Sequence, residues 1–235
     1  MLSLEVHNEC LPEILAASLL VRAISNFQGM VLLAERGMIS EAETLLRCML
    51  EVRFAAVAVA KNKNFAFELL NNDLFERKDA LNACLRSKYL AATELQIAKE
   101  ELDEIKRKIK TECLKKISIR SIAEKAGLAG TYDSAYKKLS STIHASVRSL
   151  NQYLETGGTD KIQSFLWGPD VRGIDIVLLT GVETILDVLE GVFQVFSITI
   201  RGEIDLLSRK FQEAWKSFVA SEKNGSGGKS GKVGS

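Results

Sequence analysis

The chain has 235 residues, 46% of them hydrophobic, which is enough for a sizeable core within one domain. Its formal net charge is +1, which excludes a global electrostatic attraction to nucleic acid or to an anionic membrane surface. Only two prolines occur, and long segments with helical periodicity dominate, so an all-α fold is predicted. The four cysteines are widely spaced and form no C-x-x-C pair, which favours a reducing, cytoplasmic location.

The first two predicted helices are joined at Gly37. The first spans residues 11–36, with Pro12 in its first turn, and it ends where glycine readily adopts a left-handed backbone. The second begins with a capping box formed by Ser40 and Glu43 and continues to about residue 61. Its apolar stripe recurs at helical spacing and consists of Leu46, Met49, Leu50 and Phe54.

A charged pair lies beside this apolar stripe. Arg47 and Glu51 are separated by one helical turn, so their side chains can form an ion pair. If they face the interior they must pair, because an unpaired buried charge is costly. This pair is the first feature of the sequence that packing alone does not require.

The middle of the chain predicts a helical hairpin. Residues 65–89 form one or two helices, with a weak point at 71–73 where Asp73 can cap a second piece. The next helix has a short heptad pattern, which predicts an antiparallel hairpin near residues 88–120, packed on the bundle or on a second subunit. The residues of the pattern are Leu95, Ala98, Leu102, Ile105 and Ile109.

A run of basic residues ends this hairpin. It allows two interpretations: contact with nucleic-acid phosphates, or a solvated face whose charge is balanced by the acidic residues that precede it. Few aromatic residues are interleaved for base stacking, which favours the solvated face. The run comprises Lys106, Arg107, Lys108, Lys110, Lys115, Lys116 and Arg120. A short helix over residues 118–126 follows and is stopped by Gly127.

The helix predicted over residues 132–154 has a polar ridge. Tyr136, Ser140, His144 and Arg148 follow one another at intervals of one helical turn, so they share a face. Histidine changes its charge near neutral pH, so His144 is a candidate for proton transfer or phosphate contact. The other interpretation is a core or interface histidine that a neighbouring carboxylate satisfies.

The C-terminal third begins with a loop over residues 156–173. A long segment over residues 174–219 follows, apolar nearly all round in its first half, with Gly202 as a plausible break. Its carboxylates are too frequent for a membrane span, so we expect the central helix of the bundle or a dimer surface. We predict one helical domain over residues 1–223 and a disordered Gly/Ser-rich tail over residues 224–235.

Several chemical motifs are missing from the sequence. It has no Gly-rich phosphate loop, no H-E-x-x-H, no G-x-S-x-G and no cysteine–histidine cluster. Neither histidine follows a glutamate by three residues, as a di-iron bundle requires. We therefore predict no metal and no cofactor. The N-terminus lacks the basic and apolar regions of a secretory signal.

Two helices carry a family resemblance. The segments GMISEAETLLRCMLEVR and YKKLSSTIHAS resemble the bacterial domain-of-unknown-function family DUF5677, which has an A-x-x-L-x-R-x-x-x-E helix and a later Y-x-x-L-S-x-x-x-H helix. The matching positions extend over residues 40–146. The resemblance implies a helical protein and brings no established activity with it. The matching residues are Ala42, Leu45, Arg47, Glu51, Tyr136, Leu139, Ser140 and His144.

More distantly, the chain is similar to the HEPN superfamily of helical bundles, many of which are metal-independent ribonucleases or toxins. That resemblance implies a homodimer in which an R-x4-6-H helix of each subunit lines one cleft and acts on RNA. Here no arginine precedes His144 at that distance; Lys138 lies six residues before it and Arg148 one turn after it. Arg47 would supply the missing cation if its helix packs face to face with the His144 helix.

Two hypotheses from different classes follow. The first is an RNA-directed toxin or phage-defence protein in which His144 transfers a proton, Arg47 binds phosphate, Glu51 orients Arg47, and Ser140 or Tyr136 donates a hydrogen bond. The second is a non-catalytic helical module that dimerises or senses a protein partner. In that module the same residues form a buried polar network that sets the helix register.

Overall fold

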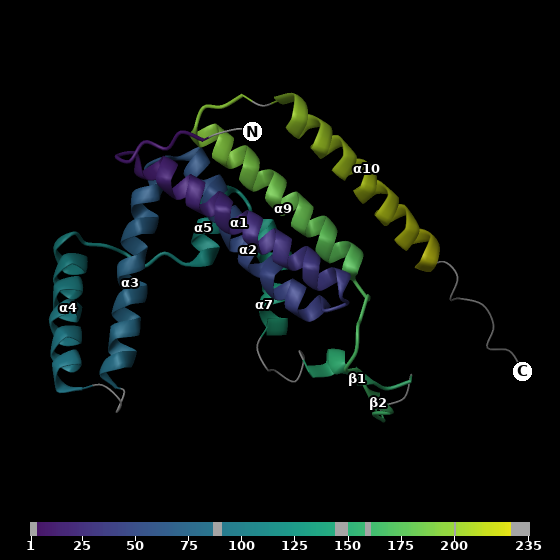
Figure 1. The fold of residues 1–235 in the computed structure, drawn as a ribbon, viewed down its shortest axis with the longest axis horizontal. Helices are drawn as coiled ribbons and strands as arrows, with labels where there is room; N and C mark the ends of the chain where they lie inside the picture. The colour runs from purple at the N-terminus through teal and green to yellow at the C-terminus, as the bar shows by residue number, and fades with distance from the viewer. Residues whose placement is uncertain (1–3, 87–90, 144–149, 158–160, 200, 227–235) are drawn as a thin grey trace, which may run out of the picture.

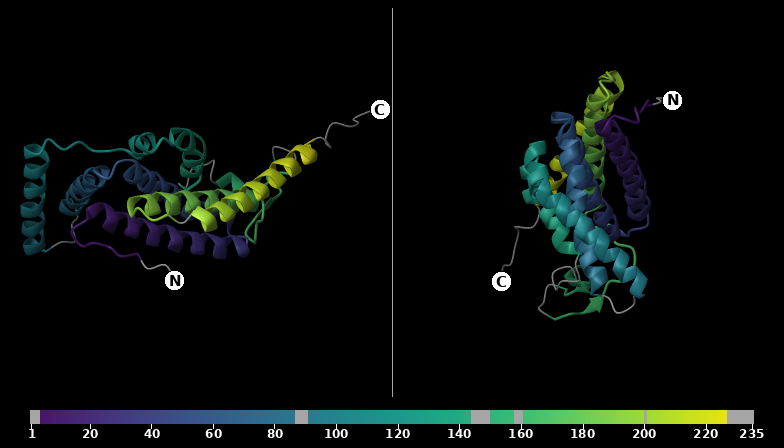
Figure 2. Two further views of the ribbon diagram at one scale, coloured as in Figure 1. Left: turned by 90° about the horizontal axis from the view of Figure 1, so that it is seen from above. Right: turned by 90° about the vertical axis from the view of Figure 1, so that its left-hand side faces the viewer.

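The computed structural model describes residues 4–86, 91–143, 150–157, 161–199 and 201–226. Three helices form the body of the molecule: α1 (Leu11–Glu35), α2 (Ile39–Lys61) and α9 (Ile174–Val195). Each of the three contacts the other two, and they run alongside one another in the ribbon views (Figures 1 and 2). The predicted all-α bundle is confirmed, because the only regular structure besides helices in the described residues is one small β-hairpin.

Helix α2 is the centre of this bundle. It packs against α1, α9, α5 (Ile119–Ala126) and α7 (Lys137–Ile143), so most of its circumference is covered. The predicted apolar stripe is buried as expected: Leu46 is 2% exposed, and the other three members are not exposed at all. A helix buried on several sides must find a partner for every polar side chain that points inward.

The α1–α2 turn confirms one prediction and corrects another. Gly37 adopts a left-handed backbone with φ of 70°. The predicted capping box at Ser40 and Glu43 is wrong, because α2 begins at Ile39 with Met38 as its N-cap. The Met38 carbonyl already accepts a helical hydrogen bond from the amide of Ala42, at 3.0 Å. Ser40 therefore lies inside the first turn, where its side chain cannot cap the helix.

A helical hairpin is present as a projecting arm (Figure 1), but its two helices span residues 65–111 and not 88–120 as predicted. Helix α3 (Phe65–Leu85) packs against α4 (Ala92–Thr111), and the heptad residues Ala98, Leu102 and Ile105 are buried between them. Helix α3 is continuous, so of the two alternatives for this segment the structure shows one helix, without a break at Asp73. The neighbouring Asn72 accepts a hydrogen bond from the amide of Ile117 (2.8 Å) without leaving the helix.

The segment that leads to the polar ridge is less regular than predicted. Helix α5 is capped by the Ser118 side chain and ends at Gly127, as expected. After the short α6 (Ala129–Thr131), the chain forms a π-helical turn, η1 (Tyr132–Tyr136), which continues directly into α7. This turn contains an extra residue, and it sets the direction in which Tyr136 points relative to the rest of α7.

The end of the helix predicted over residues 132–154 is also corrected. Asn151–Tyr153 form a 3-10 turn (η2), and β1 (Leu154–Glu155) pairs antiparallel with β2 (Ser164–Phe165). The carbonyl of Tyr153 accepts the amide of Leu166 at 2.8 Å, so sheet pairing replaces the helical hydrogen bonds there. Residues 144–149 lie outside the described part of the chain.

The C-terminal segment forms two helices. Helix α9 ends at Val195, and α10 (Arg201–Ser226) contains Gly202, so the break lies before Gly202 and not at it. In α9, the α-carbon of Gly191 faces the backbone of Ala56, as expected for a close helix contact. Helix α10 contacts α9 and then diverges from the bundle (Figure 2). It extends past residue 224, where the tail was predicted to begin.

Within the described residues one helix, α1, is long and apolar enough to cross a membrane by length and composition, with a mean hydropathy of 1.4. In the bundle α1 packs against α2 and α9. Its outer face leaves several apolar side chains exposed, among them Val21 and Leu32 at 65% and 55%.

The substitution Gly37→Ala tests how the α1–α2 turn is fixed. A Cβ at Gly37 would lie 2.7 Å from Pro169 Cβ and 2.9 Å from the amide nitrogen of Asp170, at a backbone φ that alanine disfavours. We expect a loss of more than about 1 kcal/mol in the free energy of unfolding, measured by urea denaturation. The control is Gly202→Ala, where a Cβ has nothing within 4 Å and helix propensity favours alanine. Equal stability of the two variants would contradict this account of the turn.

Candidate functional site

The candidate site is a polar cluster between α2 and the η1–α7 segment, and its members are Arg47, Glu51, Tyr136 and Ser140 (the Arg47 cluster). Arg47 Nε donates to Ser140 Oγ at 3.1 Å, and Arg47 Nη2 donates to the hydroxyl of Tyr136 at 3.0 Å. The same Nη2 forms an ion pair with Glu51 Oε1 at 3.0 Å. The Tyr136 hydroxyl in turn donates to Glu51 Oε1 at 2.8 Å. Over the described residues, α2 and the η1–α7 segment therefore meet face to face, which is the condition set for a role of Arg47 beside the polar ridge.

Aromatic packing holds Tyr136 in place beneath Arg47. Its ring stacks on Tyr132 with centroids 5.0 Å apart, and it meets Phe54 edge-on at 5.9 Å. The guanidinium carbon of Arg47 lies 5.1 Å from the centroid of the Tyr136 ring, a cation–π distance. Tyr136 is only 6% exposed, so its ring is a rigid surface against which the guanidinium packs.

The environment keeps the Tyr136 hydroxyl protonated. Burial, and then the hydrogen bond to the Glu51 carboxylate, raise the pKa of Tyr136 above its ordinary value of 10.0, and the nearby Arg47 only partly opposes this. At neutral pH the residue is therefore a neutral phenol that accepts one hydrogen bond and donates another.

The cluster is open to solvent on one side. The side chains of Arg47 and Glu51 are 27% and 30% exposed. Among the described residues, Arg47 Nη1 takes part in no hydrogen bond or ion pair, unlike Nε and Nη2. A guanidinium held in place by one carboxylate and two hydroxyls, with donors to spare, is suited to binding an oxyanion such as phosphate.

Two predicted members of the site, His144 and Arg148, lie outside the described residues. In the sequence His144 follows Ser140 by four residues. The structure thus brings together Arg47, Glu51, Tyr136 and Ser140, and the placement of the imidazole stays a prediction.

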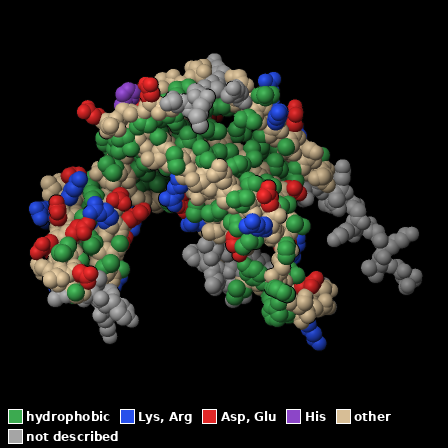
Figure 3. Space-filling view, viewed as in Figure 1, with side chains coloured by type: hydrophobic (Ala, Val, Ile, Leu, Met, Phe, Trp, Pro, Cys, Tyr) green, Lys and Arg blue, Asp and Glu red, His purple; other side chains and the backbone are tan. Residues whose placement is uncertain are grey.

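The basic run of the arm does not join this cluster. Lys106, Arg107, Lys110, Lys115 and Lys116 are all exposed, and Lys116 pairs with Asp79 at 2.8 Å. Lys106 lies 3.4 Å from Asp103. Acidic and basic side chains alternate over the surface of the arm (Figure 3). Both interpretations of the run, a solvated face and a phosphate contact, stay open, although the mixed charge favours the solvated face.

A second polar cluster was not predicted from the sequence. Arg53 of α2 points toward α9, where its Nε donates to Asp187 Oδ2 at 2.7 Å and its Nη2 donates to Glu183 Oε1 at 2.9 Å. The Arg53 side chain is 5% exposed, whereas the two carboxylates remain 40% and 34% exposed. These partners are 130 and 134 residues away in sequence, so residue spacing within one helix could not predict the pairing.

The protein is thus an all-α helical bundle with a polar cluster between its central helix and a later helix. The chain belongs to the family of unknown function DUF5677, whose model matches residues 13–162. The match contains the whole Arg47 cluster and ends before α9, which supplies the acidic partners of Arg53. Neither the comparison with curated proteins nor the comparison with solved structures found a match.

Among the described residues, no group of three or more histidine, cysteine, aspartate or glutamate side chains has a geometry that could hold a metal ion. All four cysteines are free thiols.

The raised pKa of Tyr136 predicts a specific pH dependence. Its folded-state pKa lies above the unfolded value, so the stabilisation is complete below about pH 10 and is lost as the pH rises through the folded pKa. We expect Tyr136→Phe to flatten the decline of the free energy of unfolding between pH 9.5 and 11.5, measured by urea denaturation at each pH. At pH 7 the variant loses about 1–3 kcal/mol, because Arg47 and Glu51 lose a shared partner. A variant that declines as steeply as the wild type over that range would contradict the assignment.

The Arg53 cluster predicts an asymmetry between two arginines. Removing Arg53 leaves two carboxylates without their cation at a helix interface, so Arg53→Ala should cost about 3 kcal/mol in the free energy of unfolding. Arg77→Ala is the control, since Arg77 pairs with Glu101 at the surface of the arm and such pairs contribute about 0–1 kcal/mol. Equal losses for the two variants in urea denaturation would show that the Arg53 cluster is not a structural centre.

Proposed function

We propose that this protein is a cytoplasmic, RNA-directed helical protein, a toxin or phage-defence component, that cleaves phosphodiester bonds without a metal. The observation that supports this function is the Arg47 cluster: a partly exposed guanidinium, oriented by one carboxylate and flanked by two hydroxyls. The distant resemblance to HEPN proteins points to the same chemistry and to a homodimer that binds RNA.

In this proposal Arg47 binds the scissile phosphate. Among the described residues only Nε and Nη2 of Arg47 have hydrogen-bond or ion-pair partners, so the two N–H donors of Nη1 can serve a non-bridging phosphate oxygen. Glu51 fixes the orientation of the guanidinium and neutralises part of its charge. Such preorganised donors stabilise the negative charge that develops on a phosphate in the transition state.

The reaction assigned to the site is an internal transfer of the phosphate. His144 accepts the proton of the ribose 2′-hydroxyl, and the 2′-oxygen then forms a bond to the adjacent phosphorus. The bond between phosphorus and the 5′-oxygen of the next nucleotide breaks, and that oxygen receives the proton back from the imidazolium. The products are a 2′,3′-cyclic phosphate and a 5′-hydroxyl end, and no co-reactant is consumed.

The alternative is a non-catalytic module, and one observation favours it. Tyr136 is 6% exposed, its hydroxyl both accepts and donates, and its ring packs on Phe54 and Tyr132. A network of this kind fixes the register of α7 on α2 whether or not a ligand binds. The module would then dimerise or bind a protein partner.

Incubation of the purified protein with total RNA separates the two functions. We expect the wild type to produce fragments that end in cyclic phosphate, and His144→Ala and Arg47→Ala each to lower the rate by about 100-fold or more. His7→Ala is a matched control, because His7 is the other histidine and its side chain is 75% exposed beside Glu13. Circular dichroism melts verify that the variants remain folded.

The non-catalytic alternative predicts a different pattern in the same samples. RNA stays intact with the wild type, and Arg47→Ala melts several degrees lower because Ser140, Tyr136 and Glu51 lose their shared donor. Loss of cleavage in His7→Ala as well as in His144→Ala would also contradict the assignment of His144.

A further inference from the structure

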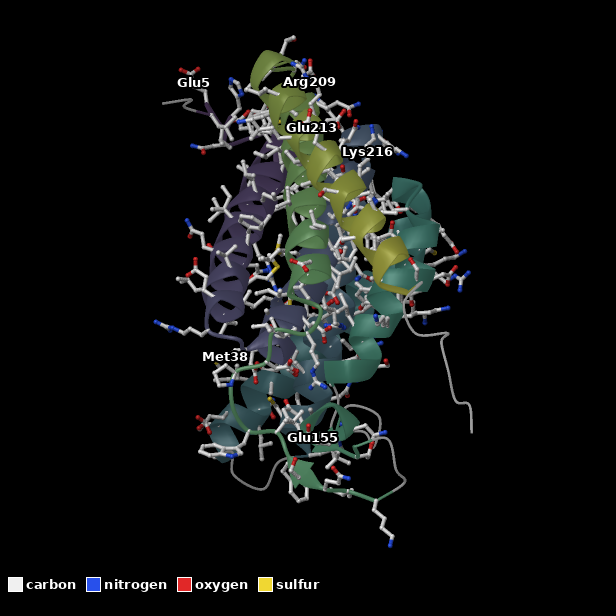
Figure 4. All side chains as sticks on the ribbon, turned by 90° about the vertical axis from the view of Figure 1, so that its right-hand side faces the viewer. Glu5, Met38, Glu155, Arg209, Glu213 and Lys216 are labelled. Atoms are coloured by element: carbon white, nitrogen blue, oxygen red, sulfur yellow. The ribbon has the colours of Figure 1, made fainter. Side chains whose placement is uncertain are left out.

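A cavity of about 580 Å³ lies between the α1–α2 turn and the segment that leads from β2 to α9. In Figure 4, Met38 marks the turn beside that segment, and Glu155 marks the hairpin below it. The volume is within the range of small-ligand pockets. The residues that carry the argument are Arg36, Ser40 and Glu41 from the turn and α2, and Tyr153, Trp167 and Arg172 from the facing side (the Trp167 cavity).

Trp167 is the feature of this cavity that packing does not explain. Its side chain is 94% exposed, although tryptophan usually buries most of its large apolar surface. The next residue is Gly168, where even a Cβ would meet nothing within 4 Å, so the space beside the ring is open. An exposed aromatic ring at the rim of a cavity is a platform on which a planar group can stack.

The loop that carries Trp167 is anchored on both sides. Before it, the amide of Leu166 donates to the carbonyl of Tyr153 at 2.8 Å; after it, the amide of Asp170 donates to the carbonyl of Gly37 at 2.8 Å. Asp170 also holds Arg172 through hydrogen bonds from Nε and Nη2. Because the backbone on both sides of Trp167 is anchored, the loop itself loses little further conformational entropy when a ligand binds.

The polar groups of the cavity fit a nucleotide. Arg36 is exposed, and no ion pair of Arg36 occurs among the described residues, so it is available to a phosphate. Arg172 neutralises Asp170 and remains 64% exposed. Glu41 in the first turn of α2 is exposed and supplies a carboxylate, an acceptor for the amino group of a base.

The cavity lies near the Arg47 cluster along α2. Ser40 lines the cavity and accepts a hydrogen bond from the hydroxyl of Tyr153 at 3.3 Å. Residues 40 and 47 are two helical turns apart, so they lie on the same face of α2, separated by about 10 Å along its axis. A single strand of RNA with a phosphate at Arg47 can therefore reach the cavity with a neighbouring nucleotide.

We propose that the Trp167 cavity is a nucleobase subsite for single-stranded RNA, in which a base stacks on Trp167 beside the phosphate bound at the Arg47 cluster. This inference rests on the proposed function and adds to it a position that selects unpaired strands. A base within a duplex is already stacked, so its face is not available to the indole ring.

A fluorescence titration tests the subsite. In the full chain with Trp215→Phe, Trp167 is the single tryptophan, and the probe is a 2′-O-methyl oligoadenylate, which lacks the attacking hydroxyl. We expect saturable quenching of Trp167. In cleavage assays Trp167→Ala should raise KM by about 5- to 100-fold with kcat unchanged, while Trp167→Phe retains most of the affinity. Because Trp167 is exposed, its substitution leaves the fold intact.

The outcomes separate this inference from the proposed function. If the wild type cleaves RNA but Trp167→Ala has the same KM and the probe does not quench, the subsite is overturned and the proposed function stands. If the wild type neither cleaves RNA nor binds the probe, the proposed function fails and the subsite fails with it. A third outcome is that Trp167→Ala leaves KM unchanged and alters only the mass of the assembly in solution, measured by light scattering. The surface is then a contact between protein chains, which also overturns the subsite.

Discussion

The fold depends on the burial of α2 among α1, α9, α5 and α7. Because most of the circumference of this helix is covered, each polar side chain on its covered faces must be matched by a neighbouring element. Arg47 and Arg53, which differ by six positions in sequence, point to different neighbours: one to η1 and α7, the other to α9. The two arginines therefore determine which helices can pack on α2 and in which register.

Both clusters pair an arginine of α2 with carboxylates, but they differ in their exposure to solvent. Arg53 is almost fully buried, and its two carboxylates use Nε and Nη2, as expected of an element that fixes the α2–α9 interface. Arg47 lies at the surface, where its single carboxylate leaves part of the guanidinium to solvent. The difference in exposure and in the number of acids is the physical basis for regarding one cluster as structural and the other as a binding site.

Patterns that repeat within one helix could be predicted from the sequence. The α2 stripe, the heptads of α4, the stop at Gly37 and the pair of Arg47 with Glu51 all depend on spacing within a few turns. The membership of Tyr136 and Ser140 in the site also followed from their ridge, once the two helices were assumed to meet. The family assignment depended on the same residues and is confirmed over residues 13–162.

Features that depend on tertiary partners could not be predicted. The pairing of Arg53 with α9 and the pairing of Leu154 with Phe165 both join segments that no local pattern connects. Serine is a common N-cap residue, so Ser40 was predicted to cap α2. The helix begins one residue before Ser40, at Ile39, after a turn in which Gly37 packs against the loop at Pro169. The π-helical turn over Tyr132–Tyr136 likewise lies where Tyr136 packs against Phe54 of α2, a contact that no local pattern in the sequence indicates.

The central claim is that Arg47 binds a phosphate, and NMR of the arginine side chains tests it most directly. In a titration of the protein with short 2′-O-methyl RNA, the Nε–H signal of Arg47 should shift and saturate. The Nε–H signal of Arg53, buried and held by Asp187, should stay in place. An unmoved Arg47 signal, or equal shifts of both, would contradict the claim and leave the cluster a structural network.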